Sequence, residues 1–289
     1  MKVETYHLEF ITPCFCAGAN QAIAEVRPAS IRGKLRWWFR VVGGSKEQEA
    51  EVFGSIRGDE GNSSSLTVRV SPHPLSRQWE PFPFQGTSNR GYVLYFAKAS
   101  ADGSRWVKGG ALPPGYLFDL QIIRRRCVSQ AAAETFDLAL GCFLMLGSFG
   151  LRSTRGLGSF ACSEAPFSEA AFTKLLERVK QRVPGFLGGL GAFRGPENQL
   201  LDALGGQLRG LRSGGYSASK PSPLGSSRPR QTSAVHLRPV RDGDGQFRLV
   251  VFEAPPDRVL GVVSRKGAPR LGNGIPTAEN PRQTQRGWR

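Results

Sequence analysis

The sequence has no apolar run of about eighteen residues, the least that a membrane-spanning helix requires. Its first residues, MKVETYHLEFITP, alternate polar and apolar types and lack the continuous apolar segment of a secretory signal. We therefore expect a chain that does not cross a membrane and that works in the cytoplasm.

Cysteine is scarce, and its spacing is that of no common metal motif. The five cysteines are an odd number, and none forms a CxxC pair. Cys14 and Cys16 would share one face of a strand and could supply two metal ligands, but no second pair follows at a suitable spacing. We expect buried free thiols, a reducing compartment, and neither a metal nor another cofactor.

Acidic residues are missing from two long stretches. Lys and Arg total 39 against 23 Asp and Glu, a formal charge of +16. No acid occurs in residues 26–46 or 203–241, which contain six and seven Lys or Arg residues. A merely soluble basic protein would spread its charges, whereas blocks of one sign are typical of surfaces that bind a phosphate backbone. The charge pattern favours a nucleic-acid partner.

The pattern of apolar residues predicts an α+β fold built on a sizeable core, with 39% hydrophobic residues and 18 Phe. Strands are expected over 3–11, 65–70, 91–97, 116–124 and 158–162. Helices are expected over 31–42, with Ser30 as N-cap, and over 131–147, while 72–83 is expected to be irregular. The order strand, helix, strand, strand, helix, strand is that of the ferredoxin-like unit, which RRM domains use to present a sheet to RNA.

The second half of the chain has weaker patterns. A helix is expected over 166–182, and two strands over 232–240 and 246–253 surround the turn Asp242-Gly-Asp-Gly245. Residues 205–231, rich in Gly, Ser, Pro and Arg, are expected to form a mobile loop. The basic tail after Arg265 is expected to be disordered.

The helix at 31–42 would carry a line of positive charge. Arg32, Arg36 and Arg40 lie on one edge at i, i+4 and i+8, beside a core face containing Leu35 and Trp38. Three aligned arginines repel one another unless an anion lies among them, and the arginine fork suits phosphate. The alternative is a solvated face with carboxylate partners from elsewhere. Trp37 could stack on a base or pack on a neighbouring domain.

A glycine-rich loop, Gly147-Ser-Phe-Gly-Leu-Arg-Ser-Thr-Arg-Gly-Leu-Gly158, would join the second helix to a strand. Its glycines permit positive φ and close backbone approach. The loop also offers charges and hydroxyl groups for phosphate or ribose oxygens, on Arg152, Ser153, Thr154 and Arg155. It lacks the GxxxxGK[ST] pattern of nucleotide hydrolases. A simple turn with surface arginines would have a similar sequence.

Taken in order, these motifs resemble a known family. The segments are Ile11-Thr-Pro, Gly18-Ala-Asn, Val26-Arg-Pro-Ala-Ser-Ile-Arg-Gly-Lys-Leu-Arg-Trp-Trp-Phe-Arg40, Glu49-Ala-Glu-Val-Phe-Gly-Ser55, the loop 150–159, and Arg230-Gln-Thr-Ser-Ala-Val-His-Leu-Arg-Pro239. Together they are similar to the RAMP superfamily of CRISPR proteins, and within it to the first-numbered subunit family of the Cmr (type III-B) effector complex. The match is strong over 11–55, good over 147–160, and thin elsewhere.

The resemblance implies two ferredoxin-like domains packed together, which we expect over 1–163 and 164–289. It also implies an RNA-binding subunit that holds guide RNA near its 3′ end, contributes to interference with target RNA in antiviral defence, and does not cleave. The partners expected are single-stranded guide RNA, other Cmr subunits and, as a further candidate, target RNA. The expected RNA-binding residues are Arg27, Arg32, Lys34, Arg36, Arg40, Gly150, Arg152, Ser153, Thr154, Arg155, Gly156 and Gly158.

Other classes of function stay open at this point. A RAMP endoribonuclease that processes guide precursors would need a general acid or base, usually a histidine. The chain offers His7, His73 and His236, none of them in a basic loop. A two-metal nuclease would need clustered carboxylates, and Asp242 and Asp244 are better explained as a turn. A purely protein-binding scaffold would leave the acid-free blocks unexplained.

Overall fold

The computed structural model describes residues 1–57, 60–74, 88–97, 110–213, 223–227 and 230–255. The N-terminal half contains β1 (Lys2–Phe10), α1 (Pro28–Val41), α2 (Lys46–Phe53), β2 (Ser55–Arg57), β3 (Glu60–Asn62), β4 (Leu66–Pro72), α3 (Asn89–Leu94), the short 3-10 helix η1 (Tyr95–Ala97), β5 (Leu117–Arg124), α4 (Gln130–Leu146) and β6 (Phe160–Cys162). The remainder contains α5 (Glu169–Arg182), β7 (Leu187–Gly195), α6 (Glu197–Ser213), β8 (Ser226–Ser227), β9 (Arg230–Gln231), β10 (Val235–Arg241) and β11 (Phe247–Glu253).

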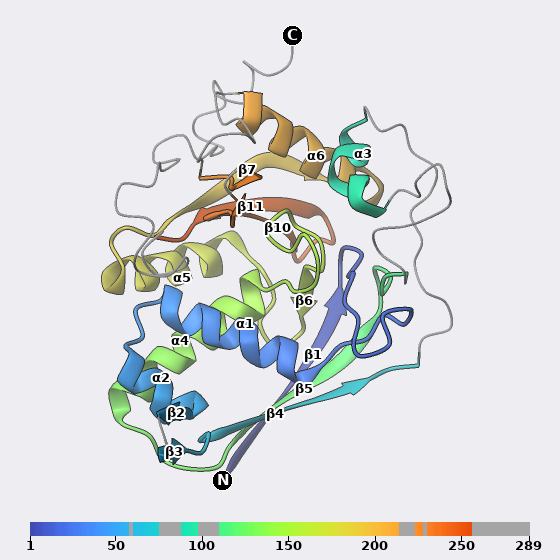
Figure 1. The fold of residues 1–289 in the computed structure, drawn as a ribbon. Coiled ribbons are helices and arrows are strands. Elements are labelled where there is room, and N and C mark those ends of the chain that lie inside the picture. Colours follow the sequence, from blue (N-terminus) through green and yellow to red (C-terminus); the bar gives the residue numbers. More distant parts are fainter. Residues whose placement is uncertain (58–59, 75–87, 98–109, 214–222, 228–229, 256–289) are drawn as a thin grey trace.

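The first sheet has the strand order β4-β5-β1-β6, with antiparallel pairing throughout. Helix α1 connects β1 to β4, and α4 connects β5 to β6, so both crossovers lie on the same face of the sheet (Figure 1). This order of elements and strands is the ferredoxin-like unit, as the sequence predicted. Among the described residues, no helix is long and apolar enough to span a membrane.

The second sheet has the order β10-β11-β7, also antiparallel. Helix α6 crosses from β7 to β10, and the hairpin of β10 and β11 completes the strand-helix-strand-strand part of a second ferredoxin-like domain. The predicted turn is present, because Asp242 N–H donates to the Gln246 carbonyl oxygen over 2.8 Å. The chain is thus an α+β protein with two ferredoxin-like domains packed together.

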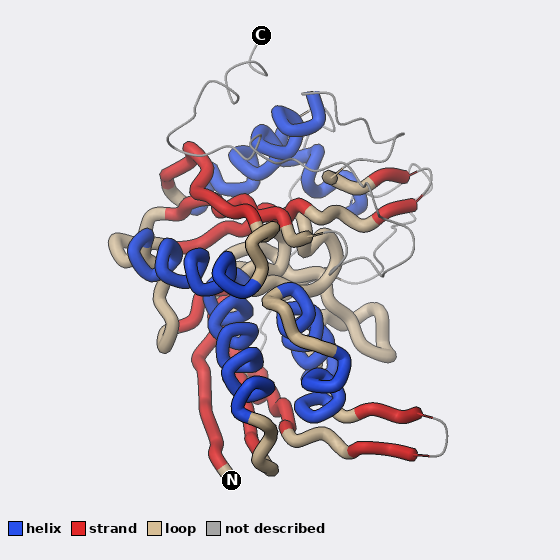
Figure 2. The backbone as a smooth tube through the Cα atoms, turned by 90° about the vertical axis from the view of Figure 1, so that its left-hand side faces the viewer, coloured by secondary structure: helices blue, strands red, loops and turns tan. Residues whose placement is uncertain are grey.

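The second sheet is buried on both faces. Helices α3 and α6 cover one face, and α1, α4 and α5 of the other layer lie against the opposite face (Figures 1 and 2). Residues on the two faces of β10 therefore enter different cores: Leu237 belongs to the cluster that contains Leu204 and Leu208 of α6, whereas Val240 belongs to the cluster shared by the two sheets. Because of this arrangement, β10 can bring polar side chains into the seam between the two sheets.

The orientation predicted for the first helix is confirmed. Ile31, Leu35, Trp38 and Phe39 are fully buried, and the Trp38 ring lies 5.2 Å from that of Phe252 on β11. The start of the helix was predicted wrongly: α1 begins at Pro28, with Arg27 as N-cap and proline in the first turn. Proline is favoured there because its missing N–H would have no helical partner.

Two other predictions were wrong. Residues 91–97 form α3 and η1 rather than a strand, and the Ser88 hydroxyl caps α3 by accepting a hydrogen bond from Gly91 N–H. Residues 205–213, expected in a loop, complete α6. Its glycines obscure the helix in the sequence. Packing requires one of them, because a Cβ on Gly205 would lie 1.9 Å from the Asn89 carbonyl oxygen of α3. Most of the predicted irregular segment 72–83, part of the predicted loop 205–231, and the tail after Arg265 lie outside the described residues.

Candidate nucleic-acid interface

The glycine-rich loop, residues 147–158, joins α4 to β6 and is tightly packed. Its backbone has positive φ at Gly150 (86°), Gly156 (86°) and Gly158 (64°). A Cβ on Gly158 would lie 2.0 Å from the Phe149 carbonyl oxygen, so only glycine fits. The close backbone approach predicted from the sequence is confirmed.

Both domains hold this loop. Gly158 N–H donates to the Pro13 carbonyl oxygen over 2.9 Å, which ties the loop to the segment after β1. On the other side, Leu237 N–H of β10 donates to the Thr154 carbonyl oxygen over 3.0 Å. The loop therefore lies at the seam between the domains, and its shape depends on both.

Two arginines of the loop carry charge without a carboxylate partner among the described residues. Arg152 has φ of 58°, unusual for a residue with a side chain, and its guanidinium lies 5.3 Å from the centre of the Phe96 ring. Burial lowers the pKa of Arg152 and of Arg155, and the charge of Arg212 on α6 lowers both further. Within the described part of the chain, neither loop arginine forms an ion pair. Arg152, Arg155 and Arg212, hereafter the cationic cluster, suit an incoming anion.

Sequence reasoning missed the α6 contribution to this cluster. Arg212 lies in the acid-free block 203–241, where the Gly and Ser content predicts a loop and the structure has the end of α6. The leucine spacing Leu200, Leu204, Leu208, Leu211 was the signal that could have revealed the helix. Tyr92 of α3 is also close to the loop, and its charge interaction raises the pKa of both loop arginines. The incorrect prediction of a strand over 91–97 gave no reason to expect it there.

The arginine stripe of α1 has an acidic partner within the protein. Glu49 of α2 is 6% exposed, and it accepts hydrogen bonds from Arg36 Nε and from Arg40 Nε, each 2.5 Å long. Burial raises the pKa of Glu49, but the two guanidinium groups outweigh this effect and hold it below its usual value. Arg32 donates to the Phe53 carbonyl oxygen instead. For Arg36 and Arg40 the structure shows the carboxylate-partner alternative, and any additional contact with RNA stays a prediction.

The other predicted residues of α1 lie in different surroundings. Lys34 reaches the glycine-rich loop, where its Nζ donates to Ser153 Oγ over 3.2 Å. Arg27 is exposed at the start of the helix, 3.9 Å from the Glu25 carboxylate. Trp37 packs against His236 of β10 with ring centres 4.9 Å apart, so of its two predicted roles the structure shows packing on the neighbouring domain. The structure thus brings Lys34 into contact with the glycine-rich loop, whereas Arg27 pairs with Glu25 instead.

A buried arginine of β10 holds the backbone of the glycine-rich loop by hydrogen bonds. Arg238 is 2% exposed, its Nε donates to the Leu146 carbonyl oxygen over 2.8 Å, and its Nη1 donates to the Ser153 carbonyl oxygen. Leu146 is the last residue of α4, where the helix dipole is negative and favours a cation. Burial lowers the pKa of Arg238, yet a guanidinium retains its proton in proteins. Arg238 therefore links the end of α4, the loop and the second sheet.

The face of the first sheet opposite α1 and α4 is poorly suited to RNA. The central strands β1 and β5 place His7 opposite Asp119 and Glu9 opposite Leu117 there. No aromatic side chain from these two strands lies on that face, since Tyr6, Phe10 and Phe118 alternate to the helix-covered side. Bases would lack the stacking platform that RRM sheets provide. The glycine-rich loop is therefore the better candidate surface.

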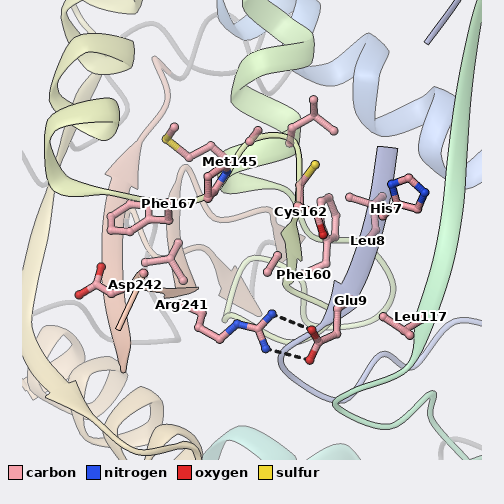
Figure 3. A pocket seen from close by; sticks show the side chains of 17 residues that line it. His7, Leu8, Glu9, Leu117, Met145, Phe160, Cys162, Phe167, Arg241 and Asp242 are labelled. Atoms are coloured by element: carbon pink, nitrogen blue, oxygen red, sulfur yellow. Dashed lines mark hydrogen bonds and ion pairs between the residues drawn. The ribbon is translucent and has the colours of Figure 1, made fainter. Parts of the chain in front are cut away.

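A pocket of about 190 Å³ lies between this sheet and the turn after β10 (Figure 3). Arg241 closes one side with two hydrogen bonds to Glu9, of 2.9 and 2.6 Å, that join the two domains. His7 at the opposite side pairs with Glu164, which raises the pKa of the imidazole. Cys162 lines the same pocket, but burial raises the pKa of its thiol to about 12, which disfavours a nucleophilic role.

The remaining groups considered for catalysis or metal binding are dispersed. His73 Nε2 lies 3.7 Å from Asp119, and His236 is buried between aromatic rings. Asp242 and Asp244 of the predicted turn pair with Arg194 of β7. Over the described residues, no group of three His, Cys, Asp or Glu side chains could hold a metal ion. All five cysteines are free, and three of them are buried.

A sequence model of the RAMP superfamily matches residues 7–161, more than half of the chain, and the chain therefore belongs to the RAMP superfamily. It is similar to two Cmr subunits of Pyrococcus furiosus. One is Cmr1-1, 28% identical over 232 residues that make up 77% of this chain and 63% of the relative. The other is Cmr1-2, 30% identical over 177 residues that make up 53% of this chain and 91% of the relative. The chain thus spans less than two thirds of the length of Cmr1-1.

Solved structures give the same fold. The crystal structure of apo Cmr1 from Pyrococcus furiosus matches with a TM-score of 0.60 and 22% identity, covering 92% of this chain and 91% of that one. A chain of the type III-B Cmr-beta complex bound to cognate target RNA and AMPPnP matches with a TM-score of 0.52 and 13% identity, covering 87% and 94%. At these identities the matches establish the fold, and they agree with the two ferredoxin-like domains described above.

Proposed function

We propose that this chain is an RNA-binding subunit of a type III-B CRISPR (Cmr) ribonucleoprotein and acts in antiviral defence. The observation that carries RNA binding is the pair Arg152 and Arg155, two partly buried guanidinium groups that form no ion pair with any described carboxylate. Membership of the RAMP superfamily and similarity to Cmr1 subunits support the assembly. Other Cmr subunits are the expected protein partners.

The ligand we propose is single-stranded guide RNA, held near its 3′ end as the resemblance to the first-numbered subunit family implies. Target RNA is a further candidate, because a structurally similar chain belongs to a complex bound to cognate target RNA. Guanidinium forks contact phosphate oxygens in pairs, and such contacts position a strand without reading its sequence. Binding should therefore be salt-dependent and tolerant of sequence.

The subunit holds RNA and does not cut it. The competing function, a RAMP endoribonuclease, needs a histidine near the scissile 2′-hydroxyl. His236 lies nearest to the loop, but burial, followed by the charges of Arg238 and Lys34, lowers its pKa well below the usual value. It is therefore a poor proton acceptor. His7 and His73 lie beside Asp119 on the sheet, away from the loop.

The domain boundary is also part of the proposal. Residues 1–163 end just after β6, and residues 164–289 begin before α5, so the break falls between two elements of the described structure. The loop that we assign to RNA lies at the contact between these units. Both domains would then shape one RNA site.

The function can be tested with purified protein and labelled single-stranded RNA. If about four phosphates are contacted, the log–log slope of affinity against salt should be about −3, because single strands give roughly −0.7 per phosphate. A flat titration would contradict RNA binding. Incubation with repeat RNA in chelator separates the holder from the endoribonuclease, since cleavage products would support the latter.

A further inference from the structure

A second group of hydrogen-bond donors lies where α1, the glycine-rich loop and β10 meet. We propose that Lys34, Ser153 and His236 form a second phosphate subsite, which takes one RNA backbone phosphate beside that held by Arg152 and Arg155. The inference rests on the proposed RNA-binding function, and it adds the position and the pH dependence of one contact.

Lys34 is the cation of this subsite. Its Nζ donates to Ser153 Oγ over 3.2 Å and lies 5.9 Å from the centre of the Trp37 ring. The side chain is half-buried, and among the described residues it has no carboxylate partner. An ammonium group has three donors, so Lys34 can retain the Ser153 hydroxyl and still bind an anion.

His236 supplies a further donor. Arg238 Nη2–H donates to its Nδ1 over 2.9 Å, which assigns the ring proton to Nε2. His236 is 3% exposed, and within the described structure its Nε2 has no hydrogen-bond partner. Buried donors without an acceptor are rare and call for an explanation. Stacking on Phe252, with ring centres 4.8 Å apart, fixes the orientation of this ring.

The charges around Lys34 favour an anion. From β10 it faces Arg238 and His236, from the loop the Ser153 hydroxyl, and from its own helix Trp37. Arg238 is already satisfied by carbonyl oxygens, including that of Leu146 at the negative end of α4. Among the described residues, the Lys34 ammonium donates to no carbonyl or carboxylate oxygen, and its hydrogen-bond partner is the Ser153 hydroxyl. A phosphate oxygen would supply an anionic acceptor.

This environment makes the contact pH-dependent. Burial, and then the charge of Arg238, lowers the pKa of Lys34 to about 8. Arg238 retains its proton, and His236 is neutral because its pKa lies well below 6.5. The Lys34 charge is therefore present below pH 8 and is lost as the pH rises through that value. If only the ammonium form binds, its population, and with it the affinity, falls about tenfold between about pH 7 and pH 9.

The test is RNA affinity as a function of pH with labelled oligocytidine, whose bases and backbone do not titrate in this range. The wild-type protein should bind about tenfold more weakly at about pH 9 than at pH 7, with the salt slope reduced by roughly 0.7. Lys34→Met should bind weakly with little pH dependence, and Lys34→Arg tightly with little pH dependence. Lys180→Ala, which removes an exposed lysine of α5, is the matched control and should keep the wild-type profile.

The possible failures can be distinguished. No binding by the wild-type protein at low salt and neutral pH would overturn the proposed function itself. Tight, salt-dependent binding that is flat with pH, or a pH profile that persists in Lys34→Met, would overturn the subsite alone. If Lys34→Met fails to fold, Lys34→Arg, which keeps the charge and a long side chain, supplies the same comparison, and a wild-type pH profile in Lys34→Arg would overturn the subsite. His236→Phe keeps a ring to stack on Phe252, and it should weaken binding several-fold without changing the pH profile; unchanged affinity would remove His236 from the subsite.

Discussion

Replacing Arg36 and Arg40 together by Ala should destabilise the protein. Both guanidinium groups bind Glu49, whose side chain is 8% exposed, so the double change leaves a buried carboxylate without these partners. Helix α2 would also lose both ion pairs to α1 and keep the hydrogen bond from Arg32 to the Phe53 carbonyl oxygen. We therefore expect Arg36 and Arg40 to act first as a structural link between α1 and α2.

The magnitude follows from the exposure of the partners. Removing one side of a buried ion pair costs about 3–5 kcal/mol, whereas exposed pairs contribute about 0–1 kcal/mol. The side chains of Arg36 and Arg40 are 41% and 52% exposed, so the pairs lie between these limits. We expect the free energy of unfolding to fall by about 2 kcal/mol.

Urea denaturation measures this loss. The midpoint should fall while the slope with denaturant stays constant. Adding Glu49→Ala to the double variant removes the stranded charge and should restore part of the stability. If the free energy of unfolding of the double variant lies within about 0.5 kcal/mol of the wild-type value, the proposed structural link is refuted. If the folded double variant also binds RNA more weakly, the predicted RNA role of these arginines would gain support.

The same pairs give a pH dependence of known sign. The folded-state pKa of Glu49 lies below its ordinary value of 4.5. Its contribution to stability is therefore complete above that pH and is lost as the pH falls through the folded-state pKa. The difference in stability between wild type and the double variant should shrink in acid, which denaturation at several pH values would show.

Two further changes test the packing. Gly156→Ala should lower stability by about 1–3 kcal/mol, because φ is 86° and the new Cβ would lie 2.6 Å from Leu204 Cδ2, whereas Gly243→Ala, with open space around it, is the control for thermal melting. Trp38→Ala should cost about 3–5 kcal/mol through loss of its contact with Phe252 and the core, and a near-native unfolding midpoint would contradict the orientation of α1.

Strong periodic patterns were sufficient to predict the four strands of the first sheet and its two crossover helices. The strand at 116–124 and the helix at 131–147 match β5 and α4 within a residue at each end. The prediction of a strand over 91–97 was wrong because short apolar runs are equally compatible with strands and with buried helices. The helical form of this run depends on the Ser88 cap and on packing against α6.

The candidate site was only partly predictable, since its partners come from distant segments. The sequence identified the glycine-rich loop and its two arginines, but the neighbouring Arg212 lies on a helix whose three glycines, at 205, 206 and 210, obscured it. Likewise, the α1 stripe was placed on the correct helix edge without its partner. Glu49 was present in the family motif, yet only the packing of α2 on α1 shows that it is the anion among those arginines.

The central claim is that the glycine-rich loop binds RNA through phosphate contacts. Its most direct test is the affinity of the Arg152→Ala/Arg155→Ala variant for single-stranded RNA over a range of salt, compared with Arg125→Ala/Arg126→Ala, which removes the same charge from two exposed positions before α4. The loop variant should bind all sequences more weakly, with the salt slope reduced by roughly 1.4, or 0.7 per contact, and the melting temperature nearly unchanged. Equal affinity and slope in the loop variant and wild type, or an equal loss in the control, would contradict the claim.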